Sequence, residues 1–157
     1  MKHVLTLLAA ICISFSCFAQ QPAVGTAVPE IKLPNVKGTE VVLSSLKGKV
    51  VILDFWASWC GPCRRSMPDL KTLYKKYKGK GLEVYAVSLD DDKDNWKRAI
   101  FEDGTSWIHV IDLKSDVAKK WEIQYIPNTY LIDKDGKVVS VNANHSALEQ
   151  QVGKLLD

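Results

Sequence analysis

Two cysteines separated by two residues are the part of this sequence best suited to do chemistry. Cys60 and Cys63 enclose Gly61 and Pro62, and they stand between an apolar run at residues 50–55 and a segment with helical spacing of apolar side chains. This order predicts a buried strand, a turn and a helix. A cysteine at a helix N-terminus is stabilised as a thiolate by free N–H groups and the helix dipole. We therefore expect Cys60 to attack a disulfide and Cys63 to resolve the resulting mixed disulfide.

A metal site and a structural disulfide are the two competing interpretations of this pair. A zinc site needs four ligands, but the sequence has no second CxxC motif, and only His109 and His145 follow the first nineteen residues. A disulfide between residues three apart closes almost no loop and so stabilises little. Redox chemistry is favoured over both, with no metal and no cofactor expected.

The first nineteen residues predict a signal peptide. Lys2 and His3 precede an apolar stretch, residues 4–18, which is shorter than the about 20 residues of a membrane span. Small residues before Gln20 predict cleavage after Ala19. An uncleaved anchor and a lipoprotein acylated at Cys17 are the alternatives. Cleavage after Ala19 and acylation at Cys17 would both leave the domain outside the cytoplasm, in the periplasm or an equivalent space.

Length and composition indicate one soluble domain at residues 20–157. The chain has 157 residues, of which 46% are hydrophobic and 25% charged, with a formal net charge of +3. Lysine and arginine alternate with acidic residues, which argues against nucleic-acid binding. We expect a monomer.

Strand and helix signals alternate along the rest of the chain. A polar turn at Asp133–Gly136 predicts a hairpin with Gly136 at positive φ, and Ser115 is placed to cap a helix. The order from residue 50 onward implies an α/β sandwich with a mixed sheet. The expected strands are 28–33, 40–43, 50–55, 83–89, 107–111, 128–132 and 137–141, and the expected helices are 62–77, 94–102, 115–121 and 147–156.

A family resemblance adds to this interpretation. The block Phe55–Cys63, which reads FWASWCGPC, resembles the thioredoxin active site, and Pro68 matches the proline that kinks the thioredoxin active-site helix. Ile126-Pro127 is similar to the family's cis-proline dipeptide, and the stretch through residues 46–51 resembles the exported TlpA/ResA branch. The resemblance implies a thioredoxin-like fold: a mixed central sheet flanked by helices, with an N-terminal strand extension and an inserted segment before the cis-proline loop.

The resemblance also implies a substrate surface. The Ile126-Pro127 bond would be cis and would face the CxxC motif, so that the backbone of Ile126 pairs with an extended client. Trp59, Gly61 and Pro62 would complete this surface. A trans proline in an ordinary loop is the alternative for Pro127.

Asp54 stands six residues before Cys60, at the position of thioredoxin's buried acid. Burial would raise the pKa of this carboxyl and let it take the proton of Cys63. The alternative is a solvated or hydrogen-bonded acid at a strand end. Two departures from the family pattern bear on this role. The lysine that partners the acid in thioredoxin falls at Ala86, and Ser66 stands where the branch often has glutamate.

The remaining aromatic and basic residues near the motif are assigned to packing or to solvent. Trp56 is expected in the core, as are Trp96, Trp107 and Trp121. Arg64 and Arg65 are expected on a solvated face of the first helical turn.

The expected function is that of an exported thiol:disulfide oxidoreductase that reduces disulfides in client proteins and receives electrons from a membrane thiol donor. Apocytochrome c maturation is one role familiar for the branch. A non-catalytic peptide-binding module with a structural disulfide is the alternative. Thiol peroxidases are disfavoured because Ala57 stands where peroxiredoxins carry a hydroxyl residue.

Overall fold

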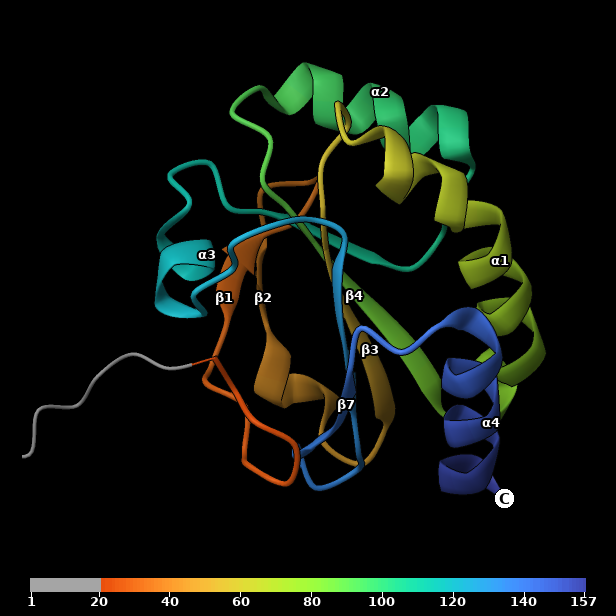
Figure 1. Ribbon diagram of the computed structural model, residues 1–157. Coiled ribbons are helices and arrows are strands. Elements are labelled where there is room, and N and C mark those ends of the chain that lie inside the picture. The colour runs from red at the N-terminus through yellow and green to blue at the C-terminus, as the bar shows by residue number, and fades with distance from the viewer. Residues whose placement is uncertain (1–20) are drawn as a thin grey trace, which may run out of the picture.

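A five-stranded mixed sheet forms the centre of the molecule (Figure 1). The computed structural model describes residues 21–157; the predicted signal peptide, its cleavage after Ala19 and acylation of Cys17 lie outside the described residues. The strand order is β5-β4-β3-β6-β7, with β3, β4 and β5 parallel and β6 and β7 antiparallel to their neighbours. The strands are β3 Val50–Trp56, β4 Leu82–Ser88, β5 Ile108–Ile111, β6 Asn128–Ile132 and β7 Val138–Val141.

Helices cover both faces of this sheet (Figure 1). One apolar cluster contains buried residues of three helices, α1 Gly61–Tyr77, α2 Lys93–Asp103 and α4 His145–Leu156. The other cluster lies beneath the N-terminal strands and the segment around α3 Asp116–Lys120. Between β4 and the Ile126-Pro127 dipeptide the chain forms α2, β5 and α3.

Strand β3 supplies both clusters because its side chains alternate. Ile52 and Trp56 belong to the cluster under α1 and α4, whereas Leu53 and Phe55 belong to the opposite one. The same alternation turns Asp54 toward α1 and α4. The predicted central strand is thus confirmed, and the alternation of its side chains places its single acid on the face beneath α1 and α4.

The N-terminal extension is a two-stranded sheet followed by a short 3-10 helix. Its elements are β1 Lys32–Pro34, β2 Glu40–Val42 and η1 Leu43–Leu46; a second 3-10 helix, η2 Lys78–Lys80, follows α1. Ala27 forms an isolated bridge to Lys137 beside β7, and Asn35 forms one to Val110 in β5. This one segment therefore contacts both edges of the central sheet.

The turn and cap predictions had mixed outcomes. Gly136 has φ +85°, which confirms the predicted hairpin turn. The predicted Ser115 cap is wrong: Ser115 has φ +55° and its side chain makes no capping bond. Asp112, directly after β5, caps α3 instead, accepting hydrogen bonds from the N–H groups of Asp116 at 3.0 Å and Ala118 at 2.9 Å. The acid is buried at the strand end, where it meets the helix N-terminus.

Within residues 21–157, no helix has both the length and the apolar character needed to cross a bilayer.

Candidate active site

Cys60 and Cys63 lie where β3 leads into α1, and they form a disulfide. Cys60 is the N-cap residue of α1, in extended conformation, and its Sγ accepts a hydrogen bond from the Cys63 N–H at 3.2 Å. Both cysteines are buried, Cys63 more deeply. The sulfur of Cys60 therefore lies at the positive end of the helix dipole, the environment that stabilises a thiolate when the disulfide is opened.

A buried acid that the sequence analysis missed holds the loop before Cys60. Asp90 is 2% exposed and accepts hydrogen bonds from the Ser58 N–H at 3.0 Å, the Ser58 hydroxyl at 2.6 Å and the Ser88 hydroxyl at 2.6 Å. Ser58 stands two residues before Cys60, so these bonds fix the approach of the chain to the redox centre. The available signal was the position of Asp90 two residues after the end of β4, because parallel strands β3 and β4 end at the same edge of the sheet.

Arg64 departs from the expectation of a solvated basic face, whereas Arg65 is exposed as expected. Its Nε donates to Asp103 at 2.8 Å and its Nη2 donates to Glu102 at 3.1 Å, and its side chain is only 26% exposed. The C-terminal end of α2 lies against the first turn of α1 and supplies both carboxylates. The two acids raise the pKa of Arg64 against the opposing effect of burial, so the ion pairs tie α1 to α2 beside the cysteines.

Asp54 is buried, as the resemblance implied, with 6% exposure. Burial raises the pKa of its carboxyl to about 7, and a hydrogen bond from the Thr129 hydroxyl, 2.8 Å from Oδ1, opposes that rise only in part. Ala86 pairs with Asp54 in the register of β3 and β4, so a small side chain stands where thioredoxin has its lysine. Of the alternative, a solvated or hydrogen-bonded strand-end acid, the solvated form is wrong because Asp54 is buried, whereas the hydrogen bond is present, from Thr129.

A small cavity connects Asp54 with the surface between α1 and α4. Its volume is about 120 Å³, and Ser66, Asp69, Thr129 and His145 are among the residues that line it. The carboxyl of Asp54 therefore faces a cavity whose wall includes other polar side chains. Ser66, which takes the place of the glutamate frequent in the branch, donates its hydroxyl to the Cys63 carbonyl at 2.8 Å.

Pro127 lies at the same edge of the sheet as the cysteines, and the Ile126-Pro127 peptide bond is cis. Strand β6 begins directly after this dipeptide, with Asn128 paired to Phe55 near the end of β3. Ile126 packs against the apolar cluster that contains Cys60 and Cys63. The structure thus brings the dipeptide and the CxxC motif together, as the resemblance implied.

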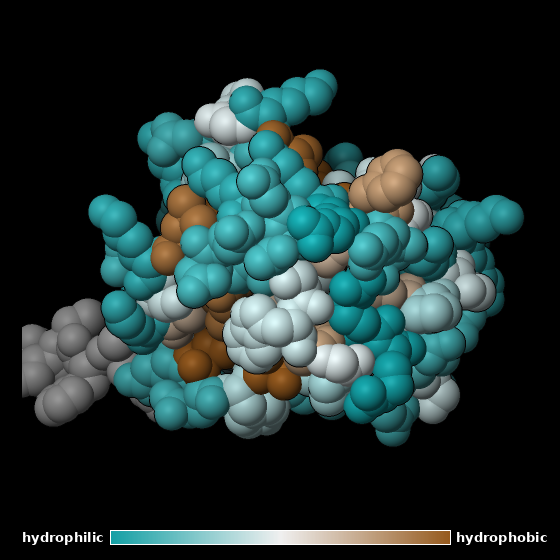
Figure 2. All heavy atoms as spheres, turned by 90° about the horizontal axis from the view of Figure 1, so that it is seen from above, coloured by the Kyte–Doolittle hydropathy of each residue, from teal (hydrophilic) through white to brown (hydrophobic). Residues whose placement is uncertain are grey.

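Exposed aromatic rings flank this edge. Trp59 is 66% exposed and Tyr125 is 62% exposed, whereas Trp56 is buried in the core as predicted. Trp96, Trp107 and Trp121 are buried as well. Figure 2, which looks down on the molecule from above, shows neutral and hydrophobic side chains between the hydrophilic ones on this face. Such a surface suits contact with a partly apolar polypeptide.

The two histidines occupy different environments. His109 is buried between Trp56 and Trp107, its Nε2 lies 2.8 Å from the Thr105 hydroxyl, and burial lowers its pKa to about 4. His145 is partly exposed at the start of α4, where its Nε2 is 4.0 Å from Glu149. In the described part of the chain, no group of three or more His, Cys, Asp or Glu side chains could hold a metal ion.

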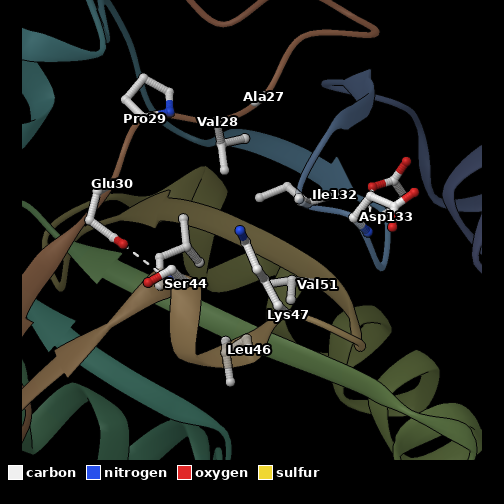
Figure 3. A pocket seen from close by; sticks show the side chains of 13 residues that line it. Ala27, Val28, Pro29, Glu30, Ser44, Leu46, Lys47, Val51, Ile132 and Asp133 are labelled. Carbon is white, nitrogen blue, oxygen red and sulfur yellow. Dashed lines mark hydrogen bonds between the residues drawn. The ribbon is translucent and has the colours of Figure 1, made fainter.

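A second cavity, of about 200 Å³, lies beside η1 and the β6–β7 hairpin, near the start of β3 (Figure 3). Val28, Val51 and Ile132 form part of its wall. Glu30 at its rim accepts hydrogen bonds from the N–H groups of Ile31 at 3.0 Å and Ser44 at 3.1 Å. Both bonds hold local backbone, so this cavity contains no group arranged for the chemistry of the cysteines.

Comparisons with known proteins agree with this geometry. The sequence profile of the AhpC/TSA family matches residues 24–141. The thiol-disulfide oxidoreductase ResA of Bacillus anthracis is 35% identical over 132 residues, which cover 84% of this chain and 76% of that protein. ResA of Geobacillus kaustophilus is 38% identical over 119 residues, which cover 76% of this chain and 68% of that protein.

Solved structures show the same likeness. The thioredoxin domain of a thiol-disulfide oxidoreductase from Bacteroides vulgatus has a TM-score of 0.81 and 35% identity, covering 86% of this chain and 99% of that one. A thiol-disulfide oxidoreductase from Bacteroides fragilis has a TM-score of 0.77 and 34% identity, covering 83% of this chain and 100% of that one. The expected thioredoxin-like fold is confirmed.

Proposed function

Since this chain belongs to the AhpC/TSA family and has the thioredoxin-like fold of thiol-disulfide oxidoreductases, we propose that it reduces disulfides in exported client proteins through Cys60 and Cys63. One observation carries the proposal: the Sγ of Cys60 caps α1 and is bonded to Cys63, at the sheet edge that also presents Pro127. This arrangement joins an activated sulfur to a surface for an extended chain.

The reaction begins with the reduced dithiol. The Cys60 thiolate attacks one sulfur of a client disulfide, the client's S–S bond breaks, and a mixed disulfide forms while a client thiolate leaves. Cys63 then attacks the Cys60 sulfur. The mixed disulfide breaks, the second client thiol is released, and the Cys60–Cys63 disulfide remains. The client gains two electrons and the enzyme loses them.

Asp54 acts in the second step. Cys63 must lose its proton to become a nucleophile, and a carboxylate with a pKa of about 7 accepts a proton near neutral pH. Asp54 and Ser66 line the same cavity, and Ser66 is bonded to the Cys63 carbonyl, so the acid lies beneath the first turns of α1. Water in the cavity lined by Asp69 and His145 would return the proton to solvent.

Client binding involves the surface around the cysteines. Trp59 supplies an exposed ring, Gly61 and Pro62 leave the helix start unobstructed, and Ile126 and Pro127 form the opposite wall. Pro127 has no N–H, so it leaves no unpaired donor where a disulfide approaches. An extended client segment would pair with the backbone of Ile126.

The sequence of the redox motif supports reduction as the direction. Gly61-Pro62 is the dipeptide of reducing thioredoxins, and no histidine stands between the cysteines to stabilise the thiolate strongly. An oxidising compartment would convert such a dithiol to its disulfide, so a membrane thiol donor must supply electrons. The predicted signal peptide is consistent with this location, and apocytochrome c is one candidate client.

Trapping tests the assignment of the two cysteines. We expect Cys63→Ser to accumulate mixed disulfides with an oxidised client protein and Cys60→Ser to accumulate none, because only Cys60 makes the first attack. The conjugates are measured on non-reducing gels after alkylation. Conjugates on Cys60→Ser alone would reverse the roles. A Cys60 thiol that resists rapid alkylation, together with no conjugates on either variant, would favour the peptide-binding module.

Equilibration of the wild-type protein with glutathione buffers tests the direction. We expect a potential near that of reducing enzymes, which is about −270 mV for thioredoxin. A value near −120 mV, typical of strong oxidants, would overturn the reductase assignment and leave the thiol exchange chemistry intact.

A further inference from the structure

Asn142 has an unusual backbone conformation at a position close to the redox edge. It directly follows β7, and its φ is +51°, in the left-handed region that most side chains avoid. Asparagine tolerates this region because its short amide can form local hydrogen bonds. The position alone explains the residue type only in part, since glycine would adopt the same backbone at lower cost.

The contacts of Asn142 explain the rest. Its N–H donates to the Thr129 carbonyl at 2.7 Å, and its Oδ1 accepts from the Thr129 N–H at 2.8 Å. Its Nδ2 donates to the Tyr125 hydroxyl at 3.1 Å. One residue thereby holds both ends of the segment that contains Ile126 and Pro127.

Each end of that segment leads to a different part of the site. Tyr125 is an exposed aromatic ring directly before Ile126, so its orientation shapes the surface that faces a client. Thr129 pairs with Asp54 in the register of β3 and β6 and donates its hydroxyl to that carboxyl. The β3–β6 pairing and the bond from the Asn142 N–H also hold Thr129, so loss of the amide contacts would change the client surface at Tyr125 while Thr129 keeps its contact with Asp54.

We propose that Asn142 is a positioning residue that holds residues 125–129 in the conformation that binds client proteins. A loop already held in its binding conformation loses less freedom when the client binds, so affinity rises without any direct contact. This inference rests on the proposed function and adds a residue that acts through Tyr125 and Thr129.

Steady-state reduction of insulin, with dithiothreitol as reductant, tests the proposal. Asn142→Gly keeps the left-handed backbone and removes both amide contacts. We expect its KM for insulin to rise roughly tenfold, equivalent to about 1.4 kcal/mol, while kcat stays within about twofold. Tyr125→Phe, which loses one contact at an exposed site, should raise KM roughly threefold. For a small disulfide, 5,5′-dithiobis(2-nitrobenzoate), Asn142→Gly should match the wild type, because this substrate does not span the loop.

Two further variants separate positioning from a merely structural role. Asn142→Asp keeps the acceptor for the Thr129 N–H, and its second carboxylate oxygen accepts a hydrogen bond from the Tyr125 hydroxyl in place of the lost amide donor, so its KM should match the wild type. Thr129→Val keeps the backbone bonds to Asn142 but loses the hydroxyl that contacts Asp54. It should lower kcat and leave the KM for insulin unchanged.

The outcomes distinguish this inference from the function on which it rests. An unchanged KM for insulin in Asn142→Gly, or an equal rise for insulin and the small disulfide, would overturn the positioning role while the wild type remains active. A wild type that reduces neither substrate would overturn the proposed function itself.

Discussion

Asp54 and Glu30 are carboxylates beside two cavities at different ends of the sheet, and their surroundings have opposite effects. Burial raises the pKa of Asp54 to about 7, and one hydroxyl, that of Thr129, opposes the rise. Burial also acts to raise the pKa of Glu30, but hydrogen bonds from Ser44 and neighbouring backbone N–H groups outweigh it and lower the pKa. A carboxylate bound by peptide N–H groups remains ionised and structural, whereas one with a single weak partner is ready to exchange a proton.

The largest effect expected from this contrast concerns stability against pH. Between about pH 4 and pH 7 folded Asp54 stays protonated while the unfolded chain ionises, so rising pH favours unfolding. Asp54→Asn removes this term. We expect the unfolding free energy of Asp54→Asn minus that of the wild type to increase by about 4 kcal/mol as the pH rises from 4 to 7, and to stay constant above pH 7. Urea titrations of the oxidised proteins measure it, and a flat difference would show that Asp54 titrates normally.

His109 gives the next largest effect, with the opposite sign. Burial lowers its pKa to about 4, so between about pH 6.5 and pH 4 His109 is protonated in the unfolded chain but neutral in the folded protein. Stability is therefore lost as pH falls from 6.5 to 4, by about 3 kcal/mol. The same urea titrations on His109→Gln should show this loss removed. In the wild type the slopes of Asp54 and His109 oppose each other in this window, and a steep slope there would contradict the assignment of one of them.

Catalysis provides the third test of the contrast. We expect Asp54→Asn to slow resolution of a mixed disulfide about 100-fold, equivalent to about 2.7 kcal/mol, because Cys63 loses its proton acceptor. Formation of the mixed disulfide by Cys60 should change much less. Rapid-quench measurement of both steps provides the comparison. Equal slowing of the two steps, or none, would indicate that Asp54 has only a structural role.

Glu30→Ala is the matched control and has the smallest expected effect. It removes the acceptor for the N–H groups of Ile31 and Ser44 and should cost about 1 kcal/mol of stability. Both steps of disulfide exchange should proceed at wild-type rates, because the cavity beside Glu30 holds none of the reacting groups. A change in either rate would show that the two ends of the sheet are coupled.

The sequence was sufficient for the fold and for most of the redox centre because both depend on local pattern. The apolar run before Cys60 predicted β3, the alternating segments predicted a mixed sheet, and the resemblance located Pro127 and Asp54. The strand and the sheet follow from residue type and spacing along the chain, whereas the roles expected of Pro127 and Asp54 came from the family resemblance.

Two of the interactions that sequence analysis missed or misjudged join segments distant in the chain. Asp90 reaches Ser58 across 32 positions, and Arg64 reaches Asp103 across 39. A charged residue on a helical turn is usually solvated, and only the end of α2 nearby changes that outcome for Arg64. The Ser115 cap failed for a local reason, since the carboxylate of Asp112, at the end of the preceding strand, already accepts hydrogen bonds from the start of α3.

The N-terminal extension has a consequence for self-association. Open strands at the rim of a sheet offer unpaired N–H and C=O groups to other molecules, and such rims template aggregation. Here Ala27 forms a β-bridge with Lys137 at the β7 edge of the sheet, and Asn35 forms one with Val110 at the β5 edge. A segment of fewer than twenty residues thus pairs with both edge strands. Deleting it would expose two edge strands that can aggregate, even though every catalytic group would remain in place.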